Sequence, residues 1–281
     1  MTERRVRPAC LCFLCAFCAI HPIIFVLFSN KGQRYEPTFV LPFVARSPNP
    51  PDTNLSSPRL GTWRRARLWK QLFDELQPLS GAEVGVWKGH FASVLVPWVP
   101  SLRRYYLVDP WQHQAEWNKP FNVKNETFEN IFLEAMQRTR DSRTASSKKY
   151  VVMRGFSQDM ARKFQDGQLD FVYLDGDHTA NGTIVDLIAW YPKVRPGGLI
   201  CGDDYTDTER RGVKHEATRV KSVVDLFAAA TGSEVQRIGA LQFYFRKPSL
   251  GRFHHANMGN IEAIIRSKFR NVTQTFVSSL P

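Results

Sequence analysis

The chain has 281 residues, 43% of them apolar and 12% aromatic, which is enough to bury the core of one domain, or at most two. Lys and Arg number 38 against 26 Asp and Glu, but no basic stripe is interleaved with aromatic residues. This argues against a nucleic-acid partner, whereas an anionic membrane surface or an acidic substrate fits the charge. Four of the five cysteines lie in one apolar run, a spacing that matches neither a disulfide framework nor a zinc site.

The N-terminal part predicts a tail, a membrane anchor and a stalk. Residues 9–28 form an uncharged apolar run, long enough at about 1.5 Å per residue to cross the roughly 30 Å hydrocarbon core of a bilayer. Three arginines lie within residues 1–8, which favours a cytoplasmic tail and a single-pass type II protein. Residues 29–60 contain six prolines and predict a semi-extended stalk.

This topology would place the part of the chain after the stalk in the lumen, with the ER or Golgi as the expected location. Four N-x-S/T sequons agree with lumenal exposure. They begin at Asn54, Asn125, Asn181 and Asn271. A cleaved signal peptide is the alternative to the anchor.

From residue 61 onward, strand-like and helix-like segments alternate. Apolar runs predict strands over residues 82–86, 105–108, 150–153, 169–174, 199–201, 234–238 and 241–246. Helices are expected between them, among others over residues 89–96 and 214–230. The alternation predicts a Rossmann-like, doubly wound α/β fold with a mostly parallel seven-stranded sheet and a closing antiparallel hairpin. The domain is expected to end near residue 247, with residues 248–281 as a C-terminal tail.

Ligands bind such sheets at the carboxyl ends of the strands, so the residues that follow each strand are the candidates for chemistry. Gly85 and Gly89 follow the first strand and allow close approach of a ligand to the backbone. Asp109 ends the second strand, where a carboxylate can accept both ribose hydroxyl hydrogens of a nucleoside. After the third strand, Ser157 is expected as a helix N-cap, and Ser157 or Gln158 could bond an adenine edge. Each position alone also fits an ordinary turn or helix cap.

Polar side chains are densest after the fourth and fifth strands. Asp175, Asp177 and His178 follow the fourth strand, and Asp203 and Asp204 follow the fifth. Neighbouring parallel strands would bring these carboxylates to one edge, where they repel unless a cation joins them. A hard divalent ion with oxygen ligands, Mg²⁺ or Ca²⁺, would do so. Helix caps and surface turns are the alternative.

Together these motifs resemble the class I S-adenosylmethionine (SAM)-dependent methyltransferases, over about residues 81–247. The segment 169–205 is similar to small methyltransferase-domain proteins with a D-G-D-H motif and to metal-dependent sugar O-methyltransferases of the macrocin type. Catechol O-methyltransferase is a more distant likeness. The resemblance implies SAM as cofactor, Mg²⁺ as metal, and a hydroxyl-bearing acceptor that is a glycan or a small molecule.

The resemblance also assigns roles to residues. The implied SAM-binding residues are Glu83, Gly85, Gly89, Asp109, Ser157, Gln158 and Asp175. The implied Mg²⁺ ligands are Asp175, Asp203 and Asp204. Asp177 matches the base of the sugar enzymes, and His178 stands where the catechol enzyme carries a basic lysine. The Trp-rich segment 111–121 is expected to cover the acceptor as a lid.

Two other classes of function keep the same fold. One is a hydroxylase-like enzyme related to the macrocin type; a nicotinamide enzyme is disfavoured because the third glycine of its fingerprint is missing. The other is a membrane-tethered binding protein without catalysis, which the intact acidic group argues against.

Overall fold

The computed structural model describes residues 60–115, 117, 120–141, 149–208, 218–249 and 258–268. The expected tail and anchor, and the stalk up to residue 59, lie outside these residues. Among the helices that the structure describes, none has both the length and the apolar character needed to cross a membrane. The anchor over residues 9–28 therefore stays a prediction.

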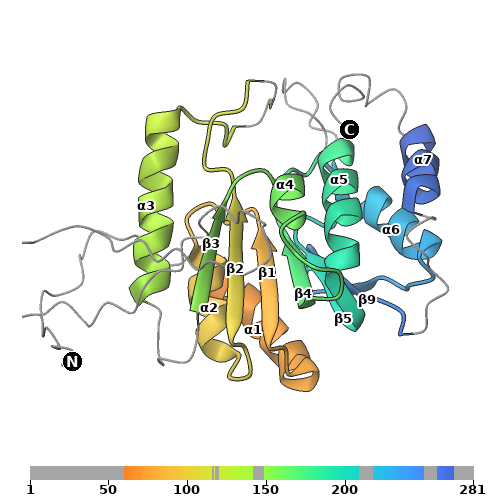
Figure 1. Cartoon of the computed structure of the whole chain (residues 1–281), viewed down its shortest axis with the longest axis horizontal. Helices are drawn as coiled ribbons and strands as arrows, with labels where there is room; N and C mark the ends of the chain where they lie inside the picture. Colours follow the sequence, from red (N-terminus) through yellow and green to blue (C-terminus); the bar gives the residue numbers. More distant parts are fainter. Residues whose placement is uncertain are drawn as a thin grey trace, which may run out of the picture. The chain divides into compact units, whose positions relative to one another are not determined.

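Seven strands pair into the main sheet of the described region (Figure 1). They are β1 (Ser80–Val84), β2 (Arg104–Asp109), β3 (Lys149–Arg154), β4 (Leu169–Leu174), β5 (Val194–Gly202), β8 (Gln236–Ile238) and β9 (Gln242–Arg246). Their order is β3-β2-β1-β4-β5-β9-β8, with β1 to β5 parallel and β9 antiparallel to both of its neighbours. The doubly wound, mostly parallel sheet with a closing hairpin is thus confirmed, and its order reverses between β1 and β4.

Helices cover both faces of the sheet (Figure 1). On one side lie α1 (Leu60–Leu76), α2 (His90–Trp98) and α3 (Asn125–Asp141). On the other side lie α4 (Ser157–Ala161), α5 (Ala180–Trp190), α6 (Val220–Ala230) and α7 (Met258–Lys268). A short 3₁₀ helix, η1 (Tyr191–Lys193), leads from α5 into β5.

The central strand β4 shows why its sequence is a continuous apolar run. Phe171 and Tyr173 pack toward α1 to α3, whereas Val172 and Leu174 pack toward α4 to α7. All four are buried, because successive side chains of a strand point to opposite faces and helices cover both.

Two helices have other bounds than expected. The helix expected over residues 89–96 runs from His90 to Trp98, because a proline next to the end of a helix removes only one of its backbone hydrogen bonds. The helix expected from residue 214 begins at Val220, since Thr218–Arg219 form a strand, β7, paired with β6 (Asp207–Thr208). Residues 209–217 are outside the described part of the chain.

The last described helix belongs to the packed domain, although it lies in the expected C-terminal tail. Ile261 of α7 is buried in the same apolar cluster as side chains of α5 and α6. This part of the tail therefore helps to cover one face of the sheet.

Candidate functional site

The turn after β1 brings the backbone of two strands together at the carboxyl edge of the sheet. Gly85 has a φ of +90°, and its N–H donates to the carbonyl of Val108 at 2.9 Å. A Cβ on Gly85 would lie 2.1 Å from the carbonyl oxygen of Asp175, so only glycine fits. Gly89, with a φ of +70°, is the N-cap of α2, and no side chain caps this end of the helix.

Asp109 lies at the end of β2, and its carboxylate holds two loops. Its Oδ2 accepts a hydrogen bond from the backbone N–H of Trp87 at 2.9 Å, and its Oδ1 accepts from that of Trp111 at 2.8 Å. Burial raises the pKa of Asp109, and these backbone hydrogen bonds act in the opposite direction. Backbone hydrogen bonds from Trp87, Trp111 and Val86 leave at least one lone pair of the carboxylate for a ligand.

Glu83 lies on the face of the sheet covered by α1 to α3 rather than at the open edge. It is 1% exposed, and its Oε2 accepts a hydrogen bond from the Tyr105 hydroxyl at 2.9 Å. Burial raises the pKa of Glu83 to about 8, although the hydrogen bond from Tyr105 lowers it. Glu83 is therefore largely neutral at pH 7, and its hydrogen bond with Tyr105 links β1 to β2.

The two residues expected beside the adenine differ in whether other side chains already occupy their polar groups. Ser157 is the first residue of α4, and the N-cap position belongs to Phe156, so the predicted cap is wrong. The Ser157 hydroxyl instead donates to the buried carboxylate of Asp186 and accepts from the Trp190 indole N–H at 2.8 Å. Gln158 is half-buried and stands next to this network.

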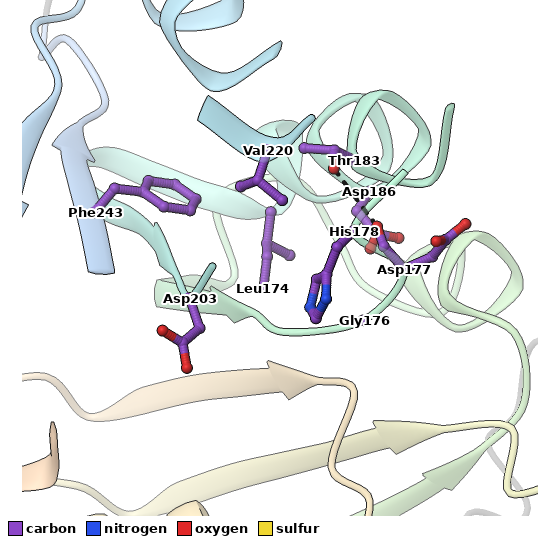
Figure 2. A pocket seen from close by; sticks show the side chains of 9 residues that line it. All are labelled: Leu174, Gly176, Asp177, His178, Thr183, Asp186, Asp203, Val220 and Phe243. Atoms are coloured by element: carbon purple, nitrogen blue, oxygen red, sulfur yellow. Dashed lines mark hydrogen bonds between the residues drawn. The ribbon is translucent and has the colours of Figure 1, made fainter. Parts of the chain in front are cut away.

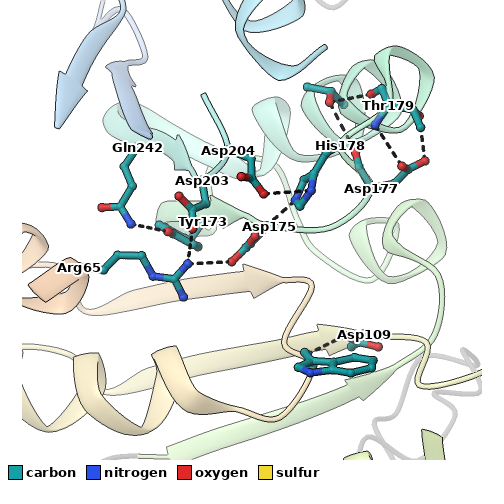
Figure 3. Close-up of polar contacts among 12 residues, drawn as sticks. Arg65, Asp109, Tyr173, Asp175, Asp177, His178, Thr179, Asp203, Asp204 and Gln242 are labelled. Atoms are coloured by element: carbon teal, nitrogen blue, oxygen red, sulfur yellow. Dashed lines mark hydrogen bonds and ion pairs between the residues drawn. The ribbon is translucent and has the colours of Figure 1, made fainter. Parts of the chain in front are cut away.

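The carboxylates after β4 and β5 lie together at the edge, as their strand positions predicted (Figure 3). His178 bridges two of them, with Nδ1 3.1 Å from Oδ2 of Asp204 and Nε2 3.4 Å from Oδ1 of Asp175. The second bridge is Arg65 of α1, whose Nη1 contacts Oδ2 of Asp175 at 3.3 Å and Oδ2 of Asp203. We call Arg65, Asp175, His178, Asp203 and Asp204 the charged cluster.

Sequence reasoning missed Arg65. Its side chain is 23% exposed, and its guanidinium carbon lies 4.7 Å above the ring of Phe91 and 6.0 Å from that of Tyr173. The available signal was its helical position, four residues before the buried Trp69, which places it on the inward face of α1. An arginine on such a face requires an acidic or aromatic partner.

The two expected bases have different surroundings. Asp177 accepts hydrogen bonds from the backbone N–H of Thr179 at 3.1 Å and from its hydroxyl at 2.9 Å, next to the start of α5. Burial lowers the pKa of His178, but its contact with Asp175 and the charges of Asp175, Asp204 and Asp177 outweigh burial and raise it to about 9. His178 is therefore mainly protonated at pH 7.

A small cavity of about 10 Å³ adjoins the charged cluster, since His178 and Asp203 are among the residues that line it (Figure 2). Its lining includes Leu174, Gly176, Asp177, His178, Thr183 and Asp186. Such a volume suits about one water molecule. A nucleoside does not fit in this cavity.

The donor set fits Mg²⁺ poorly. Among the described residues, Asp175, His178 and Asp204 offer ligand atoms within 4.8 Å of one another. A histidine nitrogen is not a ligand that Mg²⁺ prefers. The third expected ligand, Asp203, instead pairs with Arg65, which also contacts Asp175.

The segment after β2 is only partly at the surface. Trp111 is fully buried, and its indole N–H donates to the carbonyl of Trp87 at 2.8 Å, so this residue belongs to the core. Phe121 is 58% exposed and lies edge-on to the Trp87 ring, with 5.5 Å between centroids. Glu116, Asn118 and Lys119 are outside the described residues.

Residues 82–205 match a family model described as a methyltransferase domain. This segment runs from β1 to just beyond β5 and contains the site residues described above, apart from Arg65. A search of curated protein sequences finds no match.

Solved structures of methyltransferases are similar to the chain. TomG from Streptomyces achromogenes, an O-methyltransferase in complex with SAM, has 13% identity and a TM-score of 0.47, over 70% of this chain and 83% of TomG. An O-methyltransferase from Bacillus cereus has 14% identity and a TM-score of 0.46, over 69% of this chain and 85% of that one. The O-methyltransferase NovP has 19% identity and a TM-score of 0.47, over 66% of this chain and 80% of NovP.

The family match and the observed strand order point to the same kind of fold, and neither depends on these distant structures. The matched segment supplies the five parallel strands and the site at their carboxyl edge. Residues 82–205 therefore match a methyltransferase domain, and they supply most of a Rossmann-like, doubly wound sheet.

Proposed function

We propose that the protein is a membrane-anchored SAM-dependent O-methyltransferase that acts on a hydroxyl of a glycan or small molecule. The observation that supports this most is the juxtaposition, at one sheet edge, of the Gly85 turn and Asp109 with the charged cluster. The first pair suits a nucleoside with its methionine part, and the cluster suits a polar acceptor beside it.

Some of the described residues would bind SAM, and others would accept the proton of the acceptor hydroxyl. Asp109 would accept the ribose hydroxyl hydrogens, the turns at Gly85 and Gly89 would admit the methionine part, and Gln158 would bond the adenine edge. When bound, SAM would supply an electrophilic methyl group for transfer to the acceptor hydroxyl. Asp177 or His178 would take the proton of that hydroxyl.

The pH dependence of turnover separates the two proposed bases. Because the pKa of His178 is raised to about 9, a rate that depends on neutral His178 should increase with pH and level off above about 9. The variant H178N should then abolish this increase. A wild-type rate that is flat across this interval, together with inactivity of D177N, would assign the proton to Asp177 instead.

The expected Mg²⁺ ligation by Asp175, Asp203 and Asp204 stays a prediction. The pairing of two of these carboxylates with Arg65 argues against it. No step of the proposed reaction is therefore assigned to Mg²⁺.

Transfer of labelled methyl groups tests the proposal. The full chain is incubated with methyl-labelled SAM and a panel of free sugars, glycans and phenols, and methylated product and S-adenosylhomocysteine are measured. Label in a hydroxyl-bearing product, lost in D109A, is expected. SAM binding without turnover on the whole panel would favour a non-catalytic binding protein, and a folded chain that does not bind SAM would favour the hydroxylase-like alternative.

The anchor and the lumenal location are also proposed, from the apolar run over residues 9–28 and the preceding arginines. The sequon at Asn125 offers a test because its side chain is exposed at the start of α3. In cells, a mass shift that glycosidase treatment removes and that N125Q reduces is expected from lumenal exposure. Carbonate extraction then separates an anchor, which stays with the membrane, from a cleaved signal peptide, which does not.

A further inference from the structure

One positive side chain joins two carboxylates that were expected to share a metal ion. Nη1 of Arg65 contacts Oδ2 of Asp175 at 3.3 Å and also Oδ2 of Asp203 (Figure 3). The contacts link α1 to the ends of β4 and β5. A divalent ion bound to both of these oxygens would need the space that Nη1 occupies, so the arginine and the ion exclude each other.

The environment of Arg65 favours stable ion pairs with Asp175 and Asp203 over transient contacts at the surface. The side chains of Arg65, Asp175 and Asp203 are only 23%, 19% and 17% exposed. Two carboxylates with so little access to water need a compensating charge, and an arginine keeps its charge at every physiological pH. The rings of Phe91 and Tyr173 lie beside the guanidinium and fix its position.

The remaining members of the charged cluster also have an internal partner. His178 contacts Asp175 and Asp204 from the opposite side. Asp204 reaches His178 from a backbone with a φ of +52°, a conformation that non-glycine residues seldom adopt and that surrounding contacts must maintain. The three carboxylates of the cluster are thus paired with side chains of this chain.

We propose that Arg65 takes the place of a divalent cation at this site: it joins Asp175 to Asp203, excludes metal ions from them, and makes methyl transfer independent of added Mg²⁺. Independence of Mg²⁺ rests on the proposed methyltransferase function. The exclusion of metal rests on the contacts of Arg65 alone. Arg65 is a positioning residue, which fixes the ends of β4 and β5 on which Asp175 and Asp203 stand.

Electron paramagnetic resonance of Mn²⁺ tests the exclusion directly, because free and bound Mn²⁺ give different signals. The full chain is freed of metal with EDTA and titrated with Mn²⁺ as wild type, R65M, R65K and R67M. R65M should bind Mn²⁺ at least about tenfold more tightly than wild type, because it frees two carboxylates beside Asp204. R65K retains the charge, and R67M removes an exposed charge from the same helix, so both should behave as wild type.

Equal Mn²⁺ affinity of wild type and R65M, whether tight or undetectable, would overturn the proposal. If circular dichroism shows that R65M does not fold, Mn²⁺ binding by wild type and by D203N is compared instead to test the exclusion of metal. Saturable Mn²⁺ binding by wild type that D203N loses would contradict the exclusion, and no saturable binding by wild type supports it. SAM binding by the same samples is measured separately, so a failure of the methyltransferase proposal is distinguished from a failure of this one.

Discussion

Gly85 is the residue whose identity the structure constrains most tightly. Its φ of +90° lies in a region that other residues seldom adopt, and the backbone of Asp175 occupies the place of a Cβ. The turn therefore depends on glycine both for its conformation and for the approach of β1 to the loop after β4.

Gly85→Ala should destabilise the protein by about 1–3 kcal/mol or more, because the strained backbone and the displaced loop both add to the cost. Thermal or urea unfolding measures this. Gly61→Ala in α1 is the matched control, since a Cβ there meets nothing within 4 Å, and it should be neutral or slightly stabilising. Equal unfolding of the two variants would contradict the close approach at Gly85.

Glu83 makes stability depend on pH. Its pKa in the folded chain is about 8, above the ordinary value of 4.5, so between these values the folded chain binds more protons than the unfolded chain. The free energy of unfolding should therefore fall as the pH rises from 4.5 to 8, by at most about 1.4 kcal/mol per pH unit from this group. Glu83→Gln, which keeps an acceptor for Tyr105, should show a smaller decrease. Identical pH dependence of the two proteins in urea unfolding would rule out a buried, protonated Glu83.

At the scale of elements, α1 connects the sheet to the charged cluster. Trp69 is fully buried and lies edge-on to Tyr173, with 5.6 Å between ring centroids, and Phe73 packs on Phe171 at 4.3 Å. Because Arg65 lies one turn before Trp69, this packing sets the position of the guanidinium.

Trp69→Ala should cost about 3–5 kcal/mol, as a large cavity would form under α1. Trp63, on the same helix, is 41% exposed, so Trp63→Ala should cost about 1 kcal/mol or less. Urea unfolding gives both values. A loss at Trp63 as large as that at Trp69 would show that α1 is not packed as described.

The elements also show what local sequence can and cannot predict. The strands were predictable because buried parallel strands are short apolar runs, as in β4. The β6–β7 pair was missed because two-residue strands carry no periodic signal, and Val220 starts α6 later than its helical pattern suggests. Ser157 was predicted as a cap because its type favours that position, but the buried Asp186 competes for its hydroxyl.

At the scale of the whole molecule, the sequence predicted the fold and the gathering of acidic residues at the sheet edge. Both follow from the alternation of strands and helices, which predicts parallel strands, and parallel strands end at the same edge of the sheet. The role of Arg65 could not be derived in this way. It lies 110 and 138 residues from its two partners, and only the packing of α1 brings them together.

Calorimetric titration of the full chain with SAM tests whether the carboxyl edge of the sheet binds this cofactor. We expect saturable binding in the micromolar range, weakened at least about tenfold in D109N because the ribose hydroxyls lose a charged acceptor. Asp74→Asn, which changes an exposed carboxylate paired with Lys70, should leave the affinity unchanged. A folded chain that gives no heat of binding with SAM, or D109N with wild-type affinity, would contradict the proposed SAM site at this edge of the sheet.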